Sequence, residues 1–343
     1  MCGNEAIGEA AVLSGCKLYA GYPITPQNEI TAYMSKRMPE VGAVFIQAES
    51  ELAAINMIFG ASLTGERVIT TSSSPGISLK QEGISYLAGC ELPAVIVNMS
   101  RGGPGLGNIS PAQSDYLQAT KGGGHGDYHL IVLGPASVQE LFDFTCKAFD
   151  LADKYRTQVM VLGDGMLGQM MEPLILKKPK IKRYKKDWVL NGANRRSPRI
   201  VRSLYLKKGA LEKHNEKLQE KYKRIKKEQV VYEKVGSDDC DLLLVAFGSM
   251  SRIVKAAMNK AKNEGLKVGM IRPITLWPFP EKIIYEVSKK VKTILTVEMN
   301  YGQMVEDVRL ASRGNCPVHF YGRGGGGIPT EREILAKINE ILK

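Results

Sequence analysis

The six cysteines of this 343-residue chain are scattered singly, and no Cys-x-x-Cys pair occurs among them. Zinc sites, iron–sulfur clusters and disulfide frameworks depend on paired or closely spaced cysteines, so the sequence favours none of them on this chain. Long apolar runs are also missing, because those at 94–99 and 242–247 are far too short to cross a bilayer. No basic-then-apolar segment opens the chain. We therefore expect a cytoplasmic protein that does not contact the membrane.

The net charge of +12 comes from one segment. Residues 176–235 hold 21 of the 47 lysines and arginines but only 6 of the 35 acidic residues, so the rest of the chain carries 26 basic against 29 acidic groups. This segment contains no nucleic-acid-binding motif. We expect a solvated or subunit-contacting linker and no nucleic-acid partner. The alternative of a different class is a basic scaffold or binding protein whose function lies in this segment.

Short β-branched runs alternate with amphipathic helical patterns through the first 175 residues. This alternation predicts a parallel sheet of six strands that is covered by helices on both faces. The strands are predicted at 18–21, 43–47, 67–71, 94–99, 130–133 and 158–162. Helices are predicted between them at 50–62, 77–88 and 137–154.

A second α/β unit begins near residue 241, with strands predicted at 242–247, 268–271, 293–297 and 318–321. Between the two units lies the basic segment, in which residues 210–228 have the pattern of an exposed, highly charged helix. The fold class is therefore α/β, with two doubly wound domains. The predicted boundaries are 1–175 for the first domain, 176–235 for the linker and 236–343 for the second domain.

Four consecutive strands of the first unit end in polar or Gly/Pro-rich segments. Ligands of open α/β sheets bind at the carboxyl ends of the strands, so these segments predict one ligand-lined rim. The segments are GYPITP (21–26), QAESE (47–51), TSSSPG (71–76) and SRGGPGLG (100–107).

Three positions on this rim each have a structural and a ligand-binding interpretation. Thr25 before Pro26 is typical of a helix N-cap, and such a helix start also offers N–H groups to a carboxylate. Arg101 is either a solvated loop arginine or a bidentate carboxylate ligand. Glu49 and Glu51 begin the next helix and point in different directions, so at most one faces the rim. The nearly apolar stretch after Glu51 places that carboxylate beside a dry interior.

Glycine clusters at 102–107, 121–126 and 322–327 superficially suggest phosphate-binding loops. None ends in Gly-Lys-Ser/Thr, and none opens the first strand–helix crossover of its domain, so we expect no phosphate site in them. His125 lies within the second cluster. It is either a substrate-binding residue or a structural loop histidine.

The four rim motifs, in this order and spacing, resemble the alpha subunit of 2-oxoacid:ferredoxin oxidoreductases. The resemblance continues through GNEAIGEAAVLSGC (3–16), QSDYLQATKGGGHGD (113–127) and IRPITLWPFP (271–280), and covers essentially the whole chain. It implies that the first domain binds the pyrimidine ring of thiamine diphosphate and that the second is a transketolase C-terminal-like domain. The implied reaction is oxidative decarboxylation of a 2-oxoacid to acyl-coenzyme A and CO₂, with reduction of ferredoxin.

The same resemblance implies roles for individual residues. Glu51 is expected to be the catalytic carboxylate that hydrogen-bonds N1′ of the pyrimidine ring. Thr25 and Arg101 are expected to bind the substrate. The residues expected to line the cofactor are Tyr22, Pro23, Ile24, Glu51 and Ser74.

The resemblance implies a heteromer in which this chain is active only with partner subunits. A beta subunit is expected to share the thiamine diphosphate and to hold Mg²⁺, and a gamma subunit and an iron–sulfur delta subunit are expected to complete the complex. Ferredoxin is the expected electron acceptor, and the 2-oxoacid and coenzyme A are the expected substrates. The scattered cysteines agree with clusters that lie on partner subunits and not on this chain.

One motif points the other way, because Gly-Asp-Gly at 163–165 with Asn191 downstream imitates the metal-diphosphate motif of thiamine enzymes. That motif needs paired asparagines, and here Asn191 and Asn194 are separated by glycine and alanine. The stretch between them and the glycines is also too basic for such a unit. We therefore expect no metal site on this chain.

The loop sequence RGGPGLGNISPAQSDY (101–116) resembles the 2-oxoisovalerate group, whose activity is that of a 3-methyl-2-oxobutanoate dehydrogenase, more than the 2-oxoglutarate group. A 2-oxoglutarate:ferredoxin oxidoreductase alpha subunit stays open as the alternative. A split transketolase-like enzyme also stays open. A nicotinamide dehydrogenase is disfavoured, since no GxGxxG follows the first strand.

Overall fold

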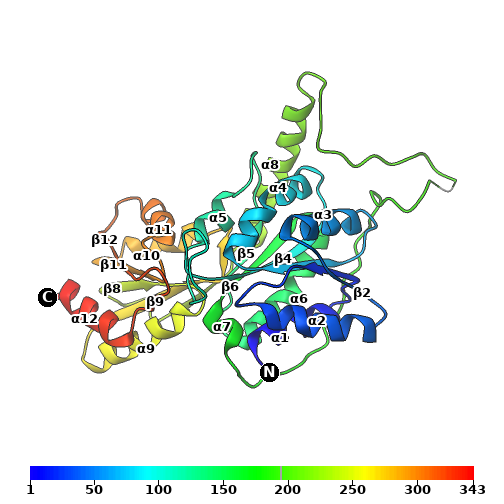
Figure 1. Ribbon diagram of the computed structural model, residues 1–343. Coiled ribbons are helices and arrows are strands. Elements are labelled where there is room, and N and C mark those ends of the chain that lie inside the picture. Colours follow the sequence, from blue (N-terminus) through cyan, green and yellow to red (C-terminus); the bar gives the residue numbers. More distant parts are fainter. Residues whose placement is uncertain (194) are drawn as a thin grey trace.

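The structure, a computed structural model, describes residues 1–193 and 195–343. Asn194, one of the two asparagines after the Gly-Asp-Gly motif, therefore lies outside the described residues. Two sheets organise the chain (Figure 1), and the first of them has seven strands in the order β10-β5-β6-β4-β3-β1-β2. The bounds of these strands are β1 Leu18–Gly21, β2 Val44–Gln47, β3 Val68–Ser72, β4 Ala94–Ser100, β5 Ile131–Leu133, β6 Gln158–Asp164 and β10 Thr275–Trp277.

The strands of the first sheet are apolar because the sheet is covered on both faces. Every residue of β4 and of β6 is buried. Strands β1 to β6 pair in parallel, with Ile69 of β3 opposite Val95 of β4 and Ser72 opposite Asn98. Parallel pairing places the carboxyl ends of all six strands at the same edge of the sheet.

Helices α3 and α4 pack against each other on one face of the first sheet, and α1 packs with α2 and α6 on the other (Figure 1). Gly83 of α4 allows close helix packing, since a Cβ there would collide with Ile55 of α3. The bounds of the helices in this half are α1 Gly3–Leu13, α2 Asn28–Glu40, α3 Glu51–Ser62, α4 Ser74–Gly89, α5 Tyr116–Lys121, α6 Val138–Tyr155 and α7 Gly165–Gln169.

The second sheet has five strands in the order β12-β11-β8-β9-β7, all parallel except β7, which pairs antiparallel with β9. Helices α9 and α12 pack together, and so do α10 and α11. The bounds are β7 Tyr232–Val235, β8 Leu242–Val245, α9 Met250–Asn263, β9 Val268–Pro273, α10 Glu281–Ser288, β11 Thr293–Glu298, α11 Met304–Ser312, β12 Val318–Gly322 and α12 Glu331–Leu342.

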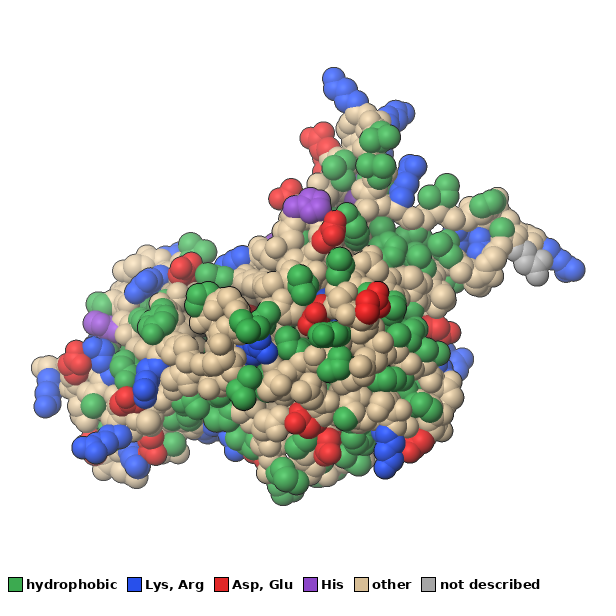
Figure 2. Space-filling model, viewed as in Figure 1, with side chains coloured by type: hydrophobic (Ala, Val, Ile, Leu, Met, Phe, Trp, Pro, Cys, Tyr) green, Lys and Arg blue, Asp and Glu red, His purple; other side chains and the backbone are tan. Residues whose placement is uncertain are grey.

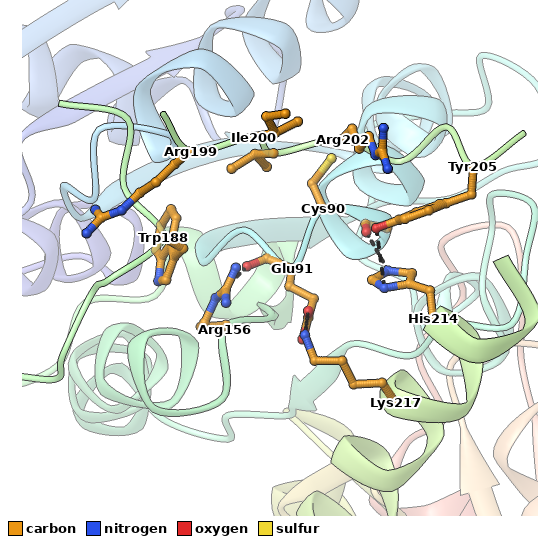
Figure 3. A pocket seen from close by; sticks show the side chains of 12 residues that line it. Cys90, Glu91, Arg156, Trp188, Arg199, Ile200, Arg202, Tyr205, His214 and Lys217 are labelled. Atoms are coloured by element: carbon orange, nitrogen blue, oxygen red, sulfur yellow. Dashed lines mark hydrogen bonds and ion pairs between the residues drawn. The ribbon is translucent and has the colours of Figure 1, made fainter. Parts of the chain in front are cut away.

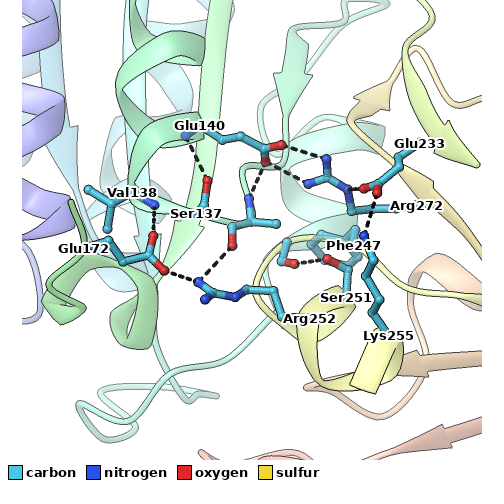
Figure 4. Close-up of polar contacts among 12 residues, drawn as sticks. Ser137, Val138, Glu140, Glu172, Glu233, Phe247, Ser251, Arg252, Lys255 and Arg272 are labelled. Atoms are coloured by element: carbon cyan, nitrogen blue, oxygen red, sulfur yellow. Dashed lines mark hydrogen bonds and ion pairs between the residues drawn. The ribbon is translucent and has the colours of Figure 1, made fainter. Parts of the chain in front are cut away.

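Ion pairs join the two halves of the chain (Figure 4). The buried Arg272 of β9 donates to both carboxylate oxygens of Glu140 on α6, each at 2.7 Å. Arg252 of α9 donates to Glu172, which follows α7, at 2.7 Å. A bidentate arginine–carboxylate pair restricts direction as well as distance. These contacts therefore hold the second sheet in one orientation relative to the first.

The linker leaves the sheets after α7, and none of its described residues forms a helix or strand before α8 (Ala210–Glu228). The first part of this loop packs on the first half of the chain, where Trp188 and Val189 are buried, and Figure 1 shows its later part standing out from both sheets. The prediction of an exposed helix at 210–228 was wrong for one face of α8, where Leu218, Tyr222 and Ile225 are buried. Their spacing of three to four residues lines them up on one side, and the Tyr222 ring packs edge-on against Trp277 of β10.

The predicted fold class, with two α/β domains built on mainly parallel sheets, is confirmed. All ten predicted strands occur, but β7 and β10 were not predicted. β10 has only three residues and pairs antiparallel with β5 of the other half, a pairing that depends on tertiary packing and leaves no periodic pattern in the sequence. No helix among the described residues combines the length and apolar character needed to span a membrane.

Candidate active site

The four predicted rim segments lie together in the structure. They follow β4, β3, β1 and β2, which are consecutive neighbours in the first sheet and run in the same direction. The prediction that the four segments share the carboxyl edge of this sheet is therefore confirmed, and the binding of a ligand there stays a prediction.

Glu51 is the first residue of α3, and its side chain is 5% exposed, whereas Glu49 is exposed. The Ser50 hydroxyl accepts the Ala53 N–H at 3.1 Å and caps the helix, so Glu51 is not needed as a cap. Its carboxylate lies against Gly76 of α4, where a side chain would collide with it. Among the described residues, no group donates a hydrogen bond to this carboxylate. A buried carboxylate needs a donor, and a protonated ring nitrogen of a cofactor fits that need.

Arg101 follows β4 and is 6% exposed, so it is not a solvated loop arginine. Its guanidinium donates to the carbonyl oxygen of Thr25 at 2.8 Å and to that of Leu106 at 3.0 Å. The Nε atom is buried and has no hydrogen-bond partner. Arg101 therefore ties the loop after β1 to the loop after β4, and its Nε–H is left without a partner.

The prediction that Thr25 caps a helix was wrong. Helix α2 begins at Asn28 and its N-cap residue is Gln27, while Thr25 lies in the preceding turn. Gln27 causes this displacement, because its buried side chain accepts from Thr71 Oγ1 at 2.5 Å and donates to the Tyr22 carbonyl at 3.3 Å. These bonds hold the turn back against β3. The Thr25 hydroxyl accepts from the Asn28 side chain at 3.3 Å.

The other residues of the first loop lie on the rim without a helix to hold them. Tyr22 is 39% exposed, and Pro23 and Ile24 are half-buried. The Gln27 N–H donates to the Ile24 carbonyl at 3.0 Å and closes the turn. The loop is joined to Arg101 through the Thr25 carbonyl, and Tyr22 is its exposed aromatic residue.

Ser74 is the first residue of α4, and its hydroxyl belongs to a partly buried polar cluster. It donates to Asp115 Oδ2 at 2.6 Å and accepts the Arg101 N–H at 3.0 Å. Asn98 of β4 donates to the same Asp115 oxygen at 2.8 Å. Burial raises the pKa of the Asp115 carboxyl, and the hydrogen bonds from Ser74 and Asn98 oppose this shift.

Sequence reasoning missed Asn98, Asp115 and Lys80, which all lie at or beneath the rim. Two of them can be recognised in the sequence. Asn98 is a polar residue within the apolar run AVIVNMS, and Lys80 shares a helix face with Gly76 and Gly83. Asp115 left no such signal. It reaches the rim only because the chain folds back after the RGGPGLG loop.

His125 and Lys121 lie away from the rim. Lys121 pairs with Asp307 of α11, and the exposed His125 accepts the Ser85 hydroxyl through its carbonyl oxygen at 2.8 Å. Ser85 is eleven residues beyond Ser74 on α4, roughly 16 Å along the helix axis. The structure therefore favours the loop-histidine interpretation of His125.

The glycine loop at 322–327 packs on the loop that follows β4. Asn108 donates to the Gly325 carbonyl at 2.9 Å, and a Cβ at Gly102 would approach the Gly326 nitrogen. Close backbone approach is thus one physical reason for glycine at these positions. The contact brings the second domain up to the rim.

Asp164, the acidic residue of the Gly-Asp-Gly motif, is fully occupied by structural contacts. Its carboxylate caps α7 by accepting the N–H groups of Met166 and Leu167 at 3.0 and 3.1 Å, and it also accepts the Ser249 hydroxyl. Burial raises the pKa of this carboxyl. Among the described residues, no three His, Cys, Asp or Glu side chains lie close enough together to hold a metal ion.

A separate basic cavity of about 480 Å³ lies between the linker, α8 and the loop before β4 (Figure 3). Lys217 pairs with Glu91 there, and His214 contacts the Gly89 carbonyl at 2.8 Å. Because residues 89–91 precede β4, this cavity lies at the opposite end of the strands from the rim. It belongs to the packing of the linker and not to the candidate active site.

Two family models match this chain. Residues 9–235 match the model described as "Pyruvate flavodoxin/ferredoxin oxidoreductase, thiamine diP-bdg", and residues 240–334 match "Pyruvate:ferredoxin oxidoreductase core domain II". The chain belongs to the 2-oxoacid:ferredoxin oxidoreductase family, whose members are multi-subunit enzymes.

Among its relatives, the ketoisovalerate oxidoreductase subunit VorB of Methanothermobacter marburgensis is 50% identical over 99% of this chain and 96% of its own length. The 2-oxoglutarate synthase subunit KorA of the same organism is 38% identical over 98% of this chain and 97% of its own length.

The fold is also that of a solved family member. In the 2-oxoglutarate:ferredoxin oxidoreductase of Magnetococcus marinus, a chain 28% identical to this one superimposes with a TM-score of 0.88. The match covers all of this chain and 65% of that chain. A split-gene transketolase shares the fold, with 15% identity and a TM-score of 0.63.

Proposed function

We propose that this chain supplies the pyrimidine-binding half of a thiamine-diphosphate site in a heteromeric enzyme that oxidises a branched-chain 2-oxoacid, chiefly 2-oxoisovalerate. The products are the acyl-coenzyme A and CO₂, and ferredoxin is reduced. The observation that carries this proposal is the 50% identity over 99% of the chain to ketoisovalerate oxidoreductase subunits, against 34–38% to three 2-oxoglutarate synthase subunits.

Glu51 is the catalytic carboxylate in this proposal. Its role is to hold a proton at N1′ of the pyrimidine ring, and its burial and lack of a hydrogen-bond partner support that role. When bound, thiamine diphosphate supplies the carbon nucleophile that side chains lack. The residues proposed to line the ring are Tyr22, Pro23, Ile24 and Ser74. Ser74 acts through its position, since its hydroxyl is bonded to Asp115 and to the Arg101 backbone.

Thr25 and Arg101 are proposed to bind the carboxylate and ketone that all 2-oxoacids share. Thr25 is half-buried on the rim, and the Nε atom of Arg101 is buried without a hydrogen-bond partner. The bond from Arg101 to the Thr25 carbonyl holds the two together without substrate. A guanidinium that is already oriented loses less conformational freedom on binding a carboxylate.

The remaining parts of the site are proposed to lie on partner subunits. The Asp164 carboxylate already caps α7 and accepts the Ser249 hydroxyl, so it is not free to bind a metal ion. This supports a diphosphate and Mg²⁺ site on a beta subunit. The unpaired cysteines support iron–sulfur clusters on a delta subunit, with a gamma subunit completing the assembly. The domain boundaries at 1–175, 176–235 and 236–343 likewise stay a proposal.

The substrate prediction concerns the far end of the pocket. A 2-oxoglutarate enzyme needs a second cation for the distal carboxylate, because a buried unpaired charge is costly. The arginine that lies on the rim of this chain is Arg101. Two of its N–H groups are already bonded to carbonyl oxygens, so it is a poor candidate for the second cation. We expect kcat/KM of the complete complex to favour 2-oxoisovalerate over 2-oxoglutarate and pyruvate. Several branched-chain acids should be used with similar efficiency, since an apolar pocket discriminates a single methylene by only about 1–3 kcal/mol.

Steady-state assays with methyl viologen and coenzyme A measure this preference. A preference for 2-oxoglutarate would contradict the branched-chain assignment and leave the family assignment intact.

The linker is proposed to bind a neighbouring subunit or an acidic ferredoxin. It combines exposed cations with exposed aliphatic side chains, of which Ile200, Leu204 and Leu206 are 78%, 67% and 87% exposed. Figure 2 shows lysine and arginine side chains standing out along this projecting segment. Charge complementarity with aliphatic anchors is a pattern of partner surfaces, so this segment is the proposed docking element.

Charge reversal tests the linker proposal. Glutamate at three exposed linker lysines should weaken complex assembly or raise KM for ferredoxin, with a larger effect at low salt than at high salt. The matched control reverses three exposed lysines at α10. The test positions are Lys177, Lys178 and Lys180, and the control positions are Lys282, Lys289 and Lys290. Equal effects of both sets, or tight DNA binding by the intact complex at physiological salt, would contradict the proposal.

A further inference from the structure

Lys80 is a fully buried lysine of α4 that none of the roles above uses. Its side chain is 0% exposed, and its Nζ donates to Thr70 Oγ1 at 2.5 Å and to the Thr71 carbonyl at 3.4 Å. The network continues from Thr71 Oγ1 to the hydroxyl of the buried Tyr19 at 2.9 Å. Burying an ammonium group is costly unless an opposite charge compensates it. A methionine would fill the same space without that cost, so the amine calls for a reason beyond packing.

The packing of α3 on α4 places this amine beneath Glu51. Gly76 meets the Glu51 carboxylate, and Gly83 meets Ile55, which is one turn after Glu51. Lys80 lies between these two glycines on α4, one turn after Gly76 and on the same face. One helical turn rises about 5.4 Å, so Lys80 enters the core within roughly one turn of the carboxylate.

Glu51 is the charge that acts on Lys80. Burial lowers the pKa of the Lys80 amine to about 7, and the negative charge of Glu51 opposes this shift. From β3 the amine faces only the hydroxyl of Thr70 and the carbonyl of Thr71, which carry no charge. Tyr19 of β1 is ionisable, but burial raises its pKa, so it stays neutral at physiological pH.

We propose that Lys80 is a positioning residue for Glu51, and that the two form one buried acid–base pair in which Lys80 sets the protonation of the carboxylate. A positive charge at Lys80 disfavours a further proton at Glu51 or on a ring nitrogen that Glu51 holds. The role of Glu51 toward the cofactor rests on the proposed function, whereas the existence of the pair does not.

The pair is tested first without cofactor, by urea unfolding of the full chain between pH 6 and pH 10. At Lys80 the folded chain binds fewer protons than the unfolded chain between its pKa of about 7 and the ordinary lysine value of 10.5, so Lys80 contributes a rise of stability with pH in that window. Lys80→Met should lose this rise. Glu51→Gln should begin it about one pH unit lower, because the charge that opposes the shift is gone. Lys147→Met, at a part-buried lysine on α6, should keep the rise.

The second test links the pair to the cofactor, through the pH profile of deuterium exchange at C2 of thiamine diphosphate bound to the reconstituted complex. Lys80→Met should move the half-maximal pH upward by roughly one unit, a change that loss of packing alone would not cause. Lys80→Gln keeps a hydrogen-bonding side chain without the charge, and it should show the same shift even where Lys80→Met assembles poorly. An unchanged profile in the Gln variant, or an unchanged stability window in Glu51→Gln, would overturn the proposal. Normal exchange in Glu51→Gln would instead overturn the proposed function.

Discussion

Deuterium exchange at C2 of thiamine diphosphate is expected to slow by about 10²–10⁴-fold when Glu51 is replaced with glutamine in the reconstituted complex, the usual contribution of a general acid–base group. Glutamine keeps the shape of the side chain and removes only the carboxylate that shares a proton. Helix α3 should persist, since its cap is the Ser50 hydroxyl. NMR of the bound cofactor after rapid quenching measures the rate, and gel filtration of the variant complex verifies its assembly.

Glu49→Gln is the matched control for this experiment. The two residues are the same in type and only two positions apart, but Glu49 is exposed and Glu51 is 5% exposed. We expect exchange in the Glu49 variant to stay within about twofold of the unmodified complex, as is usual for surface positions without special contacts. A defect in Glu49→Gln with normal exchange in Glu51→Gln would show that the wrong carboxylate was assigned.

The purified chain alone is expected to show no turnover, and adding the partner subunits should restore it completely. Pyrimidine contacts without a diphosphate and metal site leave most of the cofactor unbound, so binding of thiamine diphosphate to the isolated chain should also be weak. Methyl viologen reduction with a 2-oxoacid and coenzyme A measures turnover, and calorimetry measures cofactor binding. Turnover by the chain alone would contradict the split-site proposal.

The parallel strands of both sheets could be predicted because a covered parallel sheet requires continuous apolar segments. β4 and β6 are buried at every position, and their sequences show it. The antiparallel β10 and the buried face of α8 could not be predicted in this way. Trp277 and Tyr222 pack on each other from segments 55 residues apart, and nothing in either segment alone specifies the other.

The sequence predicted which loops form the site, but it did not predict the hydrogen bonds between their residues. The choice of Glu51 over Glu49 followed from the apolar helix beyond it, and the structure buries that side chain. The N-cap assignment of Thr25 failed because Gln27 bonds to Thr71 on a neighbouring strand, which shifts the start of the helix. Asp115 was missed for a related reason, since its partners Ser74 and Asn98 come from two other strand ends.

The sequence by itself determined the order of the parallel strands, the acidic start of α3 and the family, because local periodicity and motif spacing are carried by neighbouring residues. Only the tertiary structure decided that Arg101 bonds to the Thr25 carbonyl and that the buried Lys80 bonds to Thr70. These contacts depend on the order of strands in the sheet and on the close packing of two helices. Both are set by the burial of the whole core, so no single segment specifies them.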